Sequence, residues 1–140
     1  MRDLENAKRV LAEGGYTCVL CKDEDVCTFT LRGVKPLIQL LREGKTFCGY
    51  AAADKVVGKA TAFLYVLLGV KSVYARVMSE SAREVLLSAG IRVEIATLAA
   101  HIINRAGDGI CPFEAAVLEI SEAQTAYSAI LAKMKAMGIE

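Results

Sequence analysis

The stretch that decides the fold is residues 51–93, AAADKVVGKATAFLYVLLGVKSVYARVMSESAREVLLSAGIRV. Its first part is apolar on nearly every face once Lys59 has been passed. A segment that is apolar all round is typical of a helix buried on most sides, and Gly69 is placed to end it. The opening part is therefore predicted to be a buried helix that runs from Ala52 to Leu68.

The second part predicts a strand, a helix and another strand. Residues 72–78 have the β-branched and aromatic content of a strand, residues 82–89 carry apolar side chains at helical spacing, and residues 91–95 again have strand character. Two strands joined by a helix run parallel with a right-handed crossover, which brings the N-termini of the helices to one edge of the sheet. We expect a ligand site at that edge.

Length and composition indicate one globular domain that spans residues 1–140. Of the 140 residues, 54% are hydrophobic, which is enough for a full core. The formal charge of +1 comes from 17 basic and 16 acidic residues that form no long block of one sign, so neither nucleic acid nor a membrane surface is expected as a partner. The longest apolar run, residues 60–70, is well short of the ~20 residues that a membrane span needs.

The N-terminal sequence and the cysteines favour a cytoplasmic location. The opening residues, MRDLEN, lack the apolar segment of a secretory signal. Five cysteines, an odd number, fit free thiols in a reducing compartment. The single histidine, His101, is predicted to be a structural or surface residue on a helix, and the sequence contains no pattern that predicts a cofactor.

Outside the central stretch, the sequence predicts an N-terminal amphipathic helix, a β-hairpin and four further helices. In chain order these are a helix over residues 3–13 with Asp3 as N-cap, strands over 17–21 and 26–30, a helix from Pro36 that stops at Gly44, a helix over 98–105, a helix that starts at Pro112, and a last helix that starts at Ser121 with a capping box. We therefore predict a three-layer α/β fold with a mixed sheet, an N-terminal β-hairpin, a parallel β-α-β unit and helices on both faces.

Two sequence motifs carry a resemblance to a known family. The segments that carry the resemblance are AAADKVVGKA (residues 51–60), followed by FLY (63–65), and INRAGDGICPFE (103–114). Through these segments the chain resembles an uncharacterised domain family assigned to the cytidine-deaminase-like superfamily. The resemblance covers roughly residues 4–120. It implies the cytidine-deaminase-like fold, and it carries no established reaction.

The resemblance also indicates which residues of this sequence occupy the positions of the deaminase zinc motif. Deaminases carry a His or Cys ligand followed two residues later by Glu at the start of the buried helix, and Pro-Cys-x-x-Cys at the start of the next helix. The corresponding places hold Ala52 with Asp54, and residues 79–82 with the sequence SESA. Because a tetrahedral zinc site needs thiolate or imidazole ligands, we predict that the protein binds no metal and does not deaminate bases.

Four residues near the expected helix starts have both a structural and a functional reading. Asp54 and Lys55 stand at the predicted start of the buried helix, where the helix dipole favours a carboxylate. Alternatively, Asp54 could act as a base that faces the position of the deaminase active-site pocket. Ser81 with Glu84 fits a capping box, while exposed N–H groups near Ser79 and Ser81 could bind an anion.

The most suggestive loop precedes Pro112. Glycines allow the backbone to approach a ligand, and Asn104, Arg105 and Asp108 add polar groups, with Arg105 able to clamp a phosphate or carboxylate. A plain helix-turn-helix connection explains the glycines equally well.

Cys111 stands at the start of a predicted helix, where the dipole can lower a thiol pKa; the alternative is a small N-cap residue packed against Phe113.

These observations give one leading functional hypothesis and two alternatives. The leading one is a site for a small anionic or nucleotide-like ligand, with Asp54 as a candidate acid or base and the candidate binding residues Lys55, Ser79, Ser81, Asn104, Arg105 and Asp108. The first alternative is a non-catalytic interaction or regulatory module that forms a homo-oligomer through the apolar surface of its terminal helices, as the high apolar content and the stripe on the last helix suggest. The second is a thiol-dependent enzyme that uses Cys111 as nucleophile.

Overall fold

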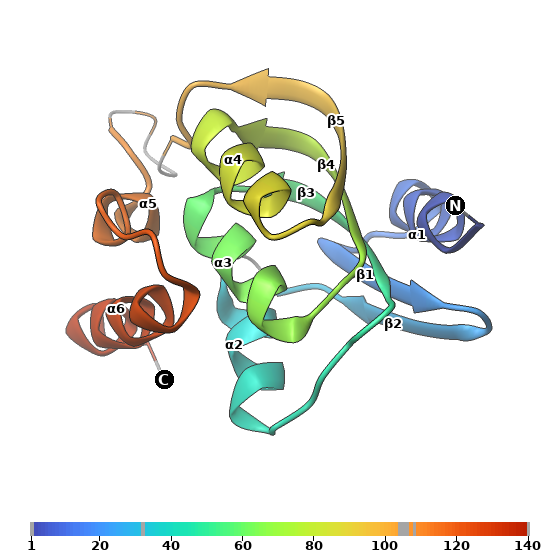
Figure 1. Cartoon of the computed structure of the whole chain (residues 1–140), viewed down its shortest axis with the longest axis horizontal. Helices are drawn as coiled ribbons and strands as arrows, with labels where there is room; N and C mark the ends of the chain where they lie inside the picture. The colour runs from blue at the N-terminus through green and yellow to red at the C-terminus, as the bar shows by residue number, and fades with distance from the viewer. Residues whose placement is uncertain (1, 32, 104–106, 108, 140) are drawn as a thin grey trace.

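The computed structural model describes residues 2–31, 33–103, 107 and 109–139. Its elements in chain order are α1 (Arg2–Glu13), β1 (Cys18–Lys22), β2 (Asp25–Phe29), α2 (Lys35–Arg42), β3 (Ala51–Val57), α3 (Lys59–Leu68), β4 (Ser72–Ser79), α4 (Glu80–Ser88), β5 (Arg92–Ala99), α5 (Pro112–Ala116) and α6 (Ala123–Ala136). The predicted α/β class is confirmed (Figure 1).

A five-stranded mixed sheet with the order β2-β1-β3-β4-β5 forms the centre of the molecule. Strand β1 pairs antiparallel with both β2 and β3, so the predicted N-terminal hairpin is confirmed and lies at one edge of the sheet. Strands β3, β4 and β5 are parallel to one another. The predicted β-α-β unit is thus confirmed, with α4 as the connection between β4 and β5, and a second unit joins β3 to β4 through α3.

The predicted helix over residues 52–68 is wrong in its first half. Residues Ala51 to Val57 form β3, the middle strand of the sheet, and the helix starts only at Lys59. Ala51, Ala52 and Ala53 are fully buried between β1 and β4. A strand buried on both faces has a continuous apolar sequence rather than an alternating one, so its periodicity alone cannot distinguish it from a buried helix.

Several predicted boundaries and caps also differ from the structure. Strand β5 continues to Ala99, so there is no helix at residues 98–103, and Ile103 instead forms an isolated antiparallel bridge with Ile110. Asp3 lies inside α1, and α6 has Glu122 as its N-cap with no side-chain cap bond, so the capping box at Ser121 is wrong. The starts of α1 and α6 differ from the predicted ones by one or two residues, which is the usual difference at helix ends.

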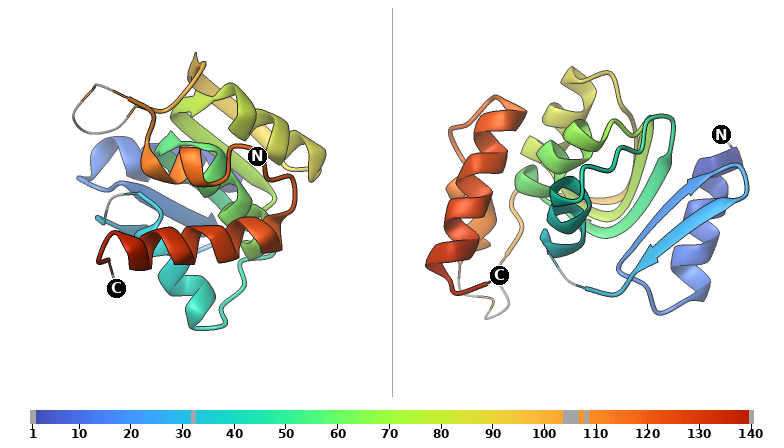
Figure 2. Two further views of the ribbon diagram at one scale, coloured as in Figure 1. Left: turned by 90° about the vertical axis from the view of Figure 1, so that its left-hand side faces the viewer. Right: turned by 90° about the horizontal axis from the view of Figure 1, so that it is seen from below.

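The helices form layers on the two faces of the sheet. Helix α1 covers one face, where Ala7 and Leu11 pack against Val19 and Ala53. Helices α2, α3 and α4 cover the other face, and α5 and α6 form an outer layer beyond α3 (Figure 2). The apolar stripe of the last helix is used inside this layer, because its buried residues Ala126, Ile130 and Met134 belong to the main core. Across the described residues, no helix combines the length and apolar character that crossing a membrane requires.

Candidate functional site

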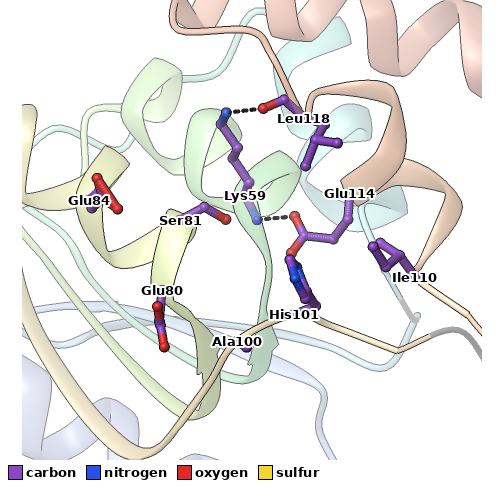
Figure 3. Close-up of a pocket in the computed structure, with 9 residues that line it drawn as sticks. All are labelled: Lys59, Glu80, Ser81, Glu84, Ala100, His101, Ile110, Glu114 and Leu118. Atoms are coloured by element: carbon purple, nitrogen blue, oxygen red, sulfur yellow. Dashed lines mark hydrogen bonds between the residues drawn. The ribbon is translucent and has the colours of Figure 1, made fainter.

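A hollow of about 200 Å³ lies at the carboxyl ends of the parallel strands, where α3 and α4 begin. Ligands of open α/β sheets bind at this edge, because the loops and helix starts that follow the strands meet there. Figure 3 shows the side chains around it. The lining residues are Lys59, Glu80, Ser81, Glu84, Ala100, His101, Ile110, Glu114 and Leu118.

A second hollow of about 450 Å³ adjoins the first one. It extends along α3 and α4 toward the start of α6, and its walls include Phe63, Val66 and Val85. The two hollows share Lys59, Ser81 and Glu84. We call these two adjoining hollows together the groove; charged side chains gather at its sheet edge, and Phe63, Val66 and Val85 lie along its helical part.

The start of α3 is occupied by a carboxylate from α5. The backbone N–H of Lys59 donates to Glu114 Oε2 with an N···O distance of 2.5 Å, and Glu114 is only 5% exposed. Gly58 leaves the room for this contact, since a Cβ atom there would lie 2.9 Å from Glu114 Cδ. Lys59 also donates from Nζ to the carbonyl oxygen of Leu118 at 2.9 Å. A helix N-terminus favours a negative charge, so Glu114 is a favourable occupant of this position.

The start of α4 is capped by its own serine. The fully buried Ser79 is the N-cap, and its Oγ accepts a hydrogen bond from the backbone N–H of Ala82 at 3.2 Å. Ser81 Oγ lies 3.3 Å from Ser79 Oγ. The predicted capping box of Ser81 with Glu84 is therefore wrong, because Ser81 lies within the first turn of α4 and lines the groove instead.

The described lining of the first hollow is acidic. Glu80, Glu84 and Glu114 contribute three carboxylates, against the ammonium of Lys59 and the imidazole of His101. The ammonium is already engaged with the Leu118 carbonyl. An acidic lining with apolar residues beside it favours ligands that donate hydrogen bonds or carry positive charge.

A separate polar cluster lies in the core between the sheet and α3. The hydroxyl of the fully buried Tyr65 donates to Asp54 Oδ2 at 2.6 Å and lies 3.0 Å from the Sγ atom of Cys18. Burial raises the pKa of Asp54 to about 7, although hydrogen bonds from Tyr65 and the backbone of Val56 act in the opposite direction. Burial also raises the pKa of the Cys18 thiol and of the Tyr65 hydroxyl.

The predicted site residues are only partly brought together. Ser81 lines the groove, whereas Asp54 is a half-buried residue of β3 that bonds to the buried Tyr65 and is not at a helix start. Lys55 follows it on the strand, and its backbone N–H bonds to Thr17 O at 3.2 Å. Ser79 is a buried cap. The three predicted binding residues Asn104, Arg105 and Asp108 lie outside the described residues.

Cys111 is the half-buried N-cap of α5, as the structural alternative predicted. Its backbone N–H donates to the carbonyl of Ile102 at 2.9 Å. The helix that it precedes has only five residues. A helix this short provides a weak dipole, and within the described residues the Cys111 thiol has no hydrogen-bonded base to activate it.

Sequence reasoning missed most of the lining residues. The predicted helix over residues 52–68 has Lys59 in its middle, and the predicted helix that carries His101 is not formed. The available signal was the pair of valines before Gly58, since β-branched residues followed by glycine are typical of a strand end. Locating the end of β3 there would have put Lys59 at the sheet edge. Nothing in the local sequence indicates that Glu114 bonds to Lys59.

The corrected start of α3 changes the comparison with the deaminase zinc motif. The residues at the starts of α3 and α4 are Gly58, Lys59 and Ala60, and Ser79, Glu80 and Ser81. None of them carries a thiol or imidazole, so this ligand set does not fit the tetrahedral zinc of the deaminases. Within the part of the chain that the structure describes, no three His, Cys, Asp or Glu side chains are grouped so that they could hold a metal ion.

The sheet topology and the groove define an α/β protein with a candidate ligand site at the carboxyl edge of its parallel strands. A family model described as TM1506, a domain of unknown function (DUF1893), matches residues 6–134, and the chain belongs to this family. The crystal structure of a DUF1893 family protein (TM1506) from Thermotoga maritima is similar, with a TM-score of 0.87 and 22% sequence identity over 94% of this chain and 90% of that chain. At this identity the likeness shows a shared fold. None of the curated proteins matches the sequence.

Proposed function

We propose that the protein binds a small nucleoside-like ligand in the groove at the carboxyl edge of the sheet. The observation that carries the proposal is the convergence of Ser81, Glu84 and His101 on a hollow at that edge. Small-molecule sites typically occupy ~300–1,000 Å³. The first hollow alone is smaller than this range, so the ligand extends into the second hollow, where Phe63 and Val66 offer apolar surface.

The groove favours an uncharged nucleoside over the anionic or nucleotide-like ligand of the leading hypothesis. Both helix starts at this edge are already capped by oxygen atoms of the chain, from Glu114 at α3 and from Ser79 at α4. The carboxylates of Glu80 and Glu84 repel a phosphate and accept hydrogen bonds from an amino group. A base with an exocyclic amine meets both the acidic and the apolar parts of the groove.

We also propose that the scaffold is a cytidine-deaminase-like fold that has no zinc site. Support comes from the strand order, the antiparallel hairpin at one edge and the two parallel β-α-β units. The residues at the starts of α3 and α4 support the second part of the proposal, because they offer hydroxyl, amine and carboxylate groups in place of thiolate and imidazole. Fold analogy supplies no reaction, so the proposal is limited to binding.

Thermal unfolding with a ligand panel tests the binding proposal. The panel contains adenosine, cytidine, their 5′-monophosphates and inorganic phosphate. A ligand at ten times its Kd stabilises the native state by about 1.4 kcal/mol and raises the Tm by about 5 °C for a chain of this size. We expect a nucleoside to give such a rise, a smaller rise with the monophosphate, and none with phosphate.

A matched pair of variants locates the site. Glu84→Gln removes one carboxylate from the groove and is expected to weaken binding roughly tenfold, since hydrogen bonds to charged groups are the stronger ones. Glu13→Gln removes an exposed carboxylate at the end of α1, on the opposite face of the sheet, and is expected to leave binding unchanged. The absence of any shift at millimolar ligand, or equal effects of the two variants, would contradict the proposal.

The homo-oligomeric alternative loses one of its two supporting observations, the apolar stripe of the last helix. The apolar stripe of the last helix packs against the rest of the core, with Ala126 and Ile130 fully buried and Met134 1% exposed. The alternative remains a prediction that light scattering can test.

A further inference from the structure

Helix α5 is the shortest helix in the wall of the groove. It has five residues, and together with its flanking residues it contributes Ile110, Glu114 and Leu118 to the lining of the first hollow (Figure 3). Ile110 and Leu118 are 38% and 54% exposed. Glu114 is the buried side chain of the helix itself, and Val117 is the buried residue at its C-terminal cap.

The next helix is held in a different way. Helix α6 has 14 residues and buries Ala126, Ile130 and Met134 in the main core. Apolar burial stabilises in proportion to the area removed from water. Detaching α6 therefore exposes a continuous apolar stripe, whereas detaching α5 exposes Val117 and the partly buried Phe113 and returns a carboxylate to water.

Two hydrogen bonds from a single residue hold α5 over the groove. Lys59 donates its backbone N–H to Glu114 Oε2 at 2.5 Å and its ammonium to the Leu118 carbonyl at 2.9 Å. A buried carboxylate is costly unless it is hydrogen-bonded, so the position of α5 depends on the bond to Glu114. Water can replace both bonds when α5 moves outward, which makes the attachment reversible.

We infer that α5 is a lid on the groove and that Lys59 and Glu114 form its latch. The inference rests on the proposed function, because a lid regulates only a groove that takes a ligand. In the closed form, Glu114 occupies the start of α3 and α5 forms one wall of the first hollow. In the open form, the backbone N–H of Lys59 is free to meet a ligand, and the polar end of the groove is open to solvent.

Hydrogen exchange of the ligand-free protein tests the latch directly. The reporters are the amides of Ala115, Val117 and Leu118, which are hydrogen-bonded within and just after α5. Exchange of such amides reports the free energy of local opening. We expect them to exchange faster than the amides in the middle of α6 in the wild-type protein.

Three variants act on the latch from different sides. Glu114→Gln removes the charge of the acceptor, Lys59→Met removes the bond to the carbonyl that follows α5, and Gly58→Ala places a Cβ atom 2.9 Å from the carboxylate carbon. Each is expected to accelerate exchange of the α5 amides on the order of tenfold and to leave the α6 amides unchanged. Glu119→Gln, which alters an exposed carboxylate two residues after α5's C-cap, is the control and is expected to change neither.

Unchanged α5 exchange in all three variants would overturn the inference, as would equal acceleration in α5 and α6, because α5 would then not open on its own. The outcome is separable from the proposed function. Faster α5 exchange in the variants, combined with no binding of any nucleoside, would support the opening of α5 and contradict the proposed ligand. Binding of a nucleoside, combined with no effect of the three variants on α5 exchange, would support the ligand site and contradict the lid.

Discussion

The ionisation of Asp54 provides the sharpest test of the structure. The carboxyl group lies in the core beside Tyr65, and burial raises its pKa to about 7 from an ordinary value of 3.8. A group whose pKa is higher in the folded than in the unfolded state binds a proton on folding, so its contribution to stability is lost as the pH rises between the two values. The difference of about three pH units corresponds to about 4 kcal/mol of unfolding free energy.

Replacing Asp54 by Asn isolates this contribution. The Asn side chain keeps an oxygen that accepts the hydrogen bond from Tyr65, but it cannot ionise. We expect the unfolding free energy of the wild type, relative to Asp54→Asn, to be highest near pH 4 and to fall by about 4 kcal/mol by pH 8. Urea unfolding at intervals of half a pH unit measures this difference, and the other titrating groups cancel because both proteins contain them.

A second variant checks the cause of the shift. The hydrogen bond from Tyr65 lowers the pKa of Asp54 and so opposes the effect of burial. Tyr65→Phe removes this bond and is therefore expected to raise the pKa of Asp54 further. The loss of stability should then continue to a higher pH than in the wild type. A difference between wild type and Asp54→Asn that stays constant within about 1 kcal/mol from pH 4 to pH 8 would refute the buried, raised-pKa carboxyl group.

Further predictions concern other parts of the molecule. The pKa of Asp3 is lowered chiefly by its hydrogen bond with Lys71, so Asp3→Asn should destabilise the protein at pH 7, and the difference from wild type in urea unfolding should vanish as the pH falls below the folded-state pKa. Ile130→Ala removes a fully buried side chain of α6 and should cost about 2–5 kcal/mol in the same assay; a loss under 1 kcal/mol would contradict the packing of α6. Alkylation followed by mass spectrometry should show Cys111 reacting no faster than the exposed Cys48, and a faster reaction would revive the thiol-enzyme alternative. Elemental analysis after dialysis against a chelator should find no stoichiometric zinc, and one zinc per chain would contradict this expectation.

Much of the fold could be predicted from local sequence. The hairpin of β1 and β2 follows from two strand-like runs around a polar turn, and the unit β4-α4-β5 follows from the change between strand and helix periodicity. Pro36 and Pro112 mark the starts of α2 and α5, because proline lacks the N–H that the first helical turn leaves unpaired. These features depend on residues near one another in the chain, which is why a sequence pattern can carry them.

Contacts between distant segments decided the rest. Residues Ala51 to Val57 are a strand because β1 and β4 pair with them on either side, and an apolar run does not encode those neighbours. The candidate site also depends on the pairing of β3, because the end of this strand places Lys59 at the sheet edge. Glu114 reaches the start of α3 from 55 residues further along the chain, where a carboxylate can satisfy a free backbone N–H. The sequence alone determined which residues could cap a helix or line a groove, and only the tertiary structure decided which of them met, because burial and hydrogen bonding depend on what the folded chain brings within reach.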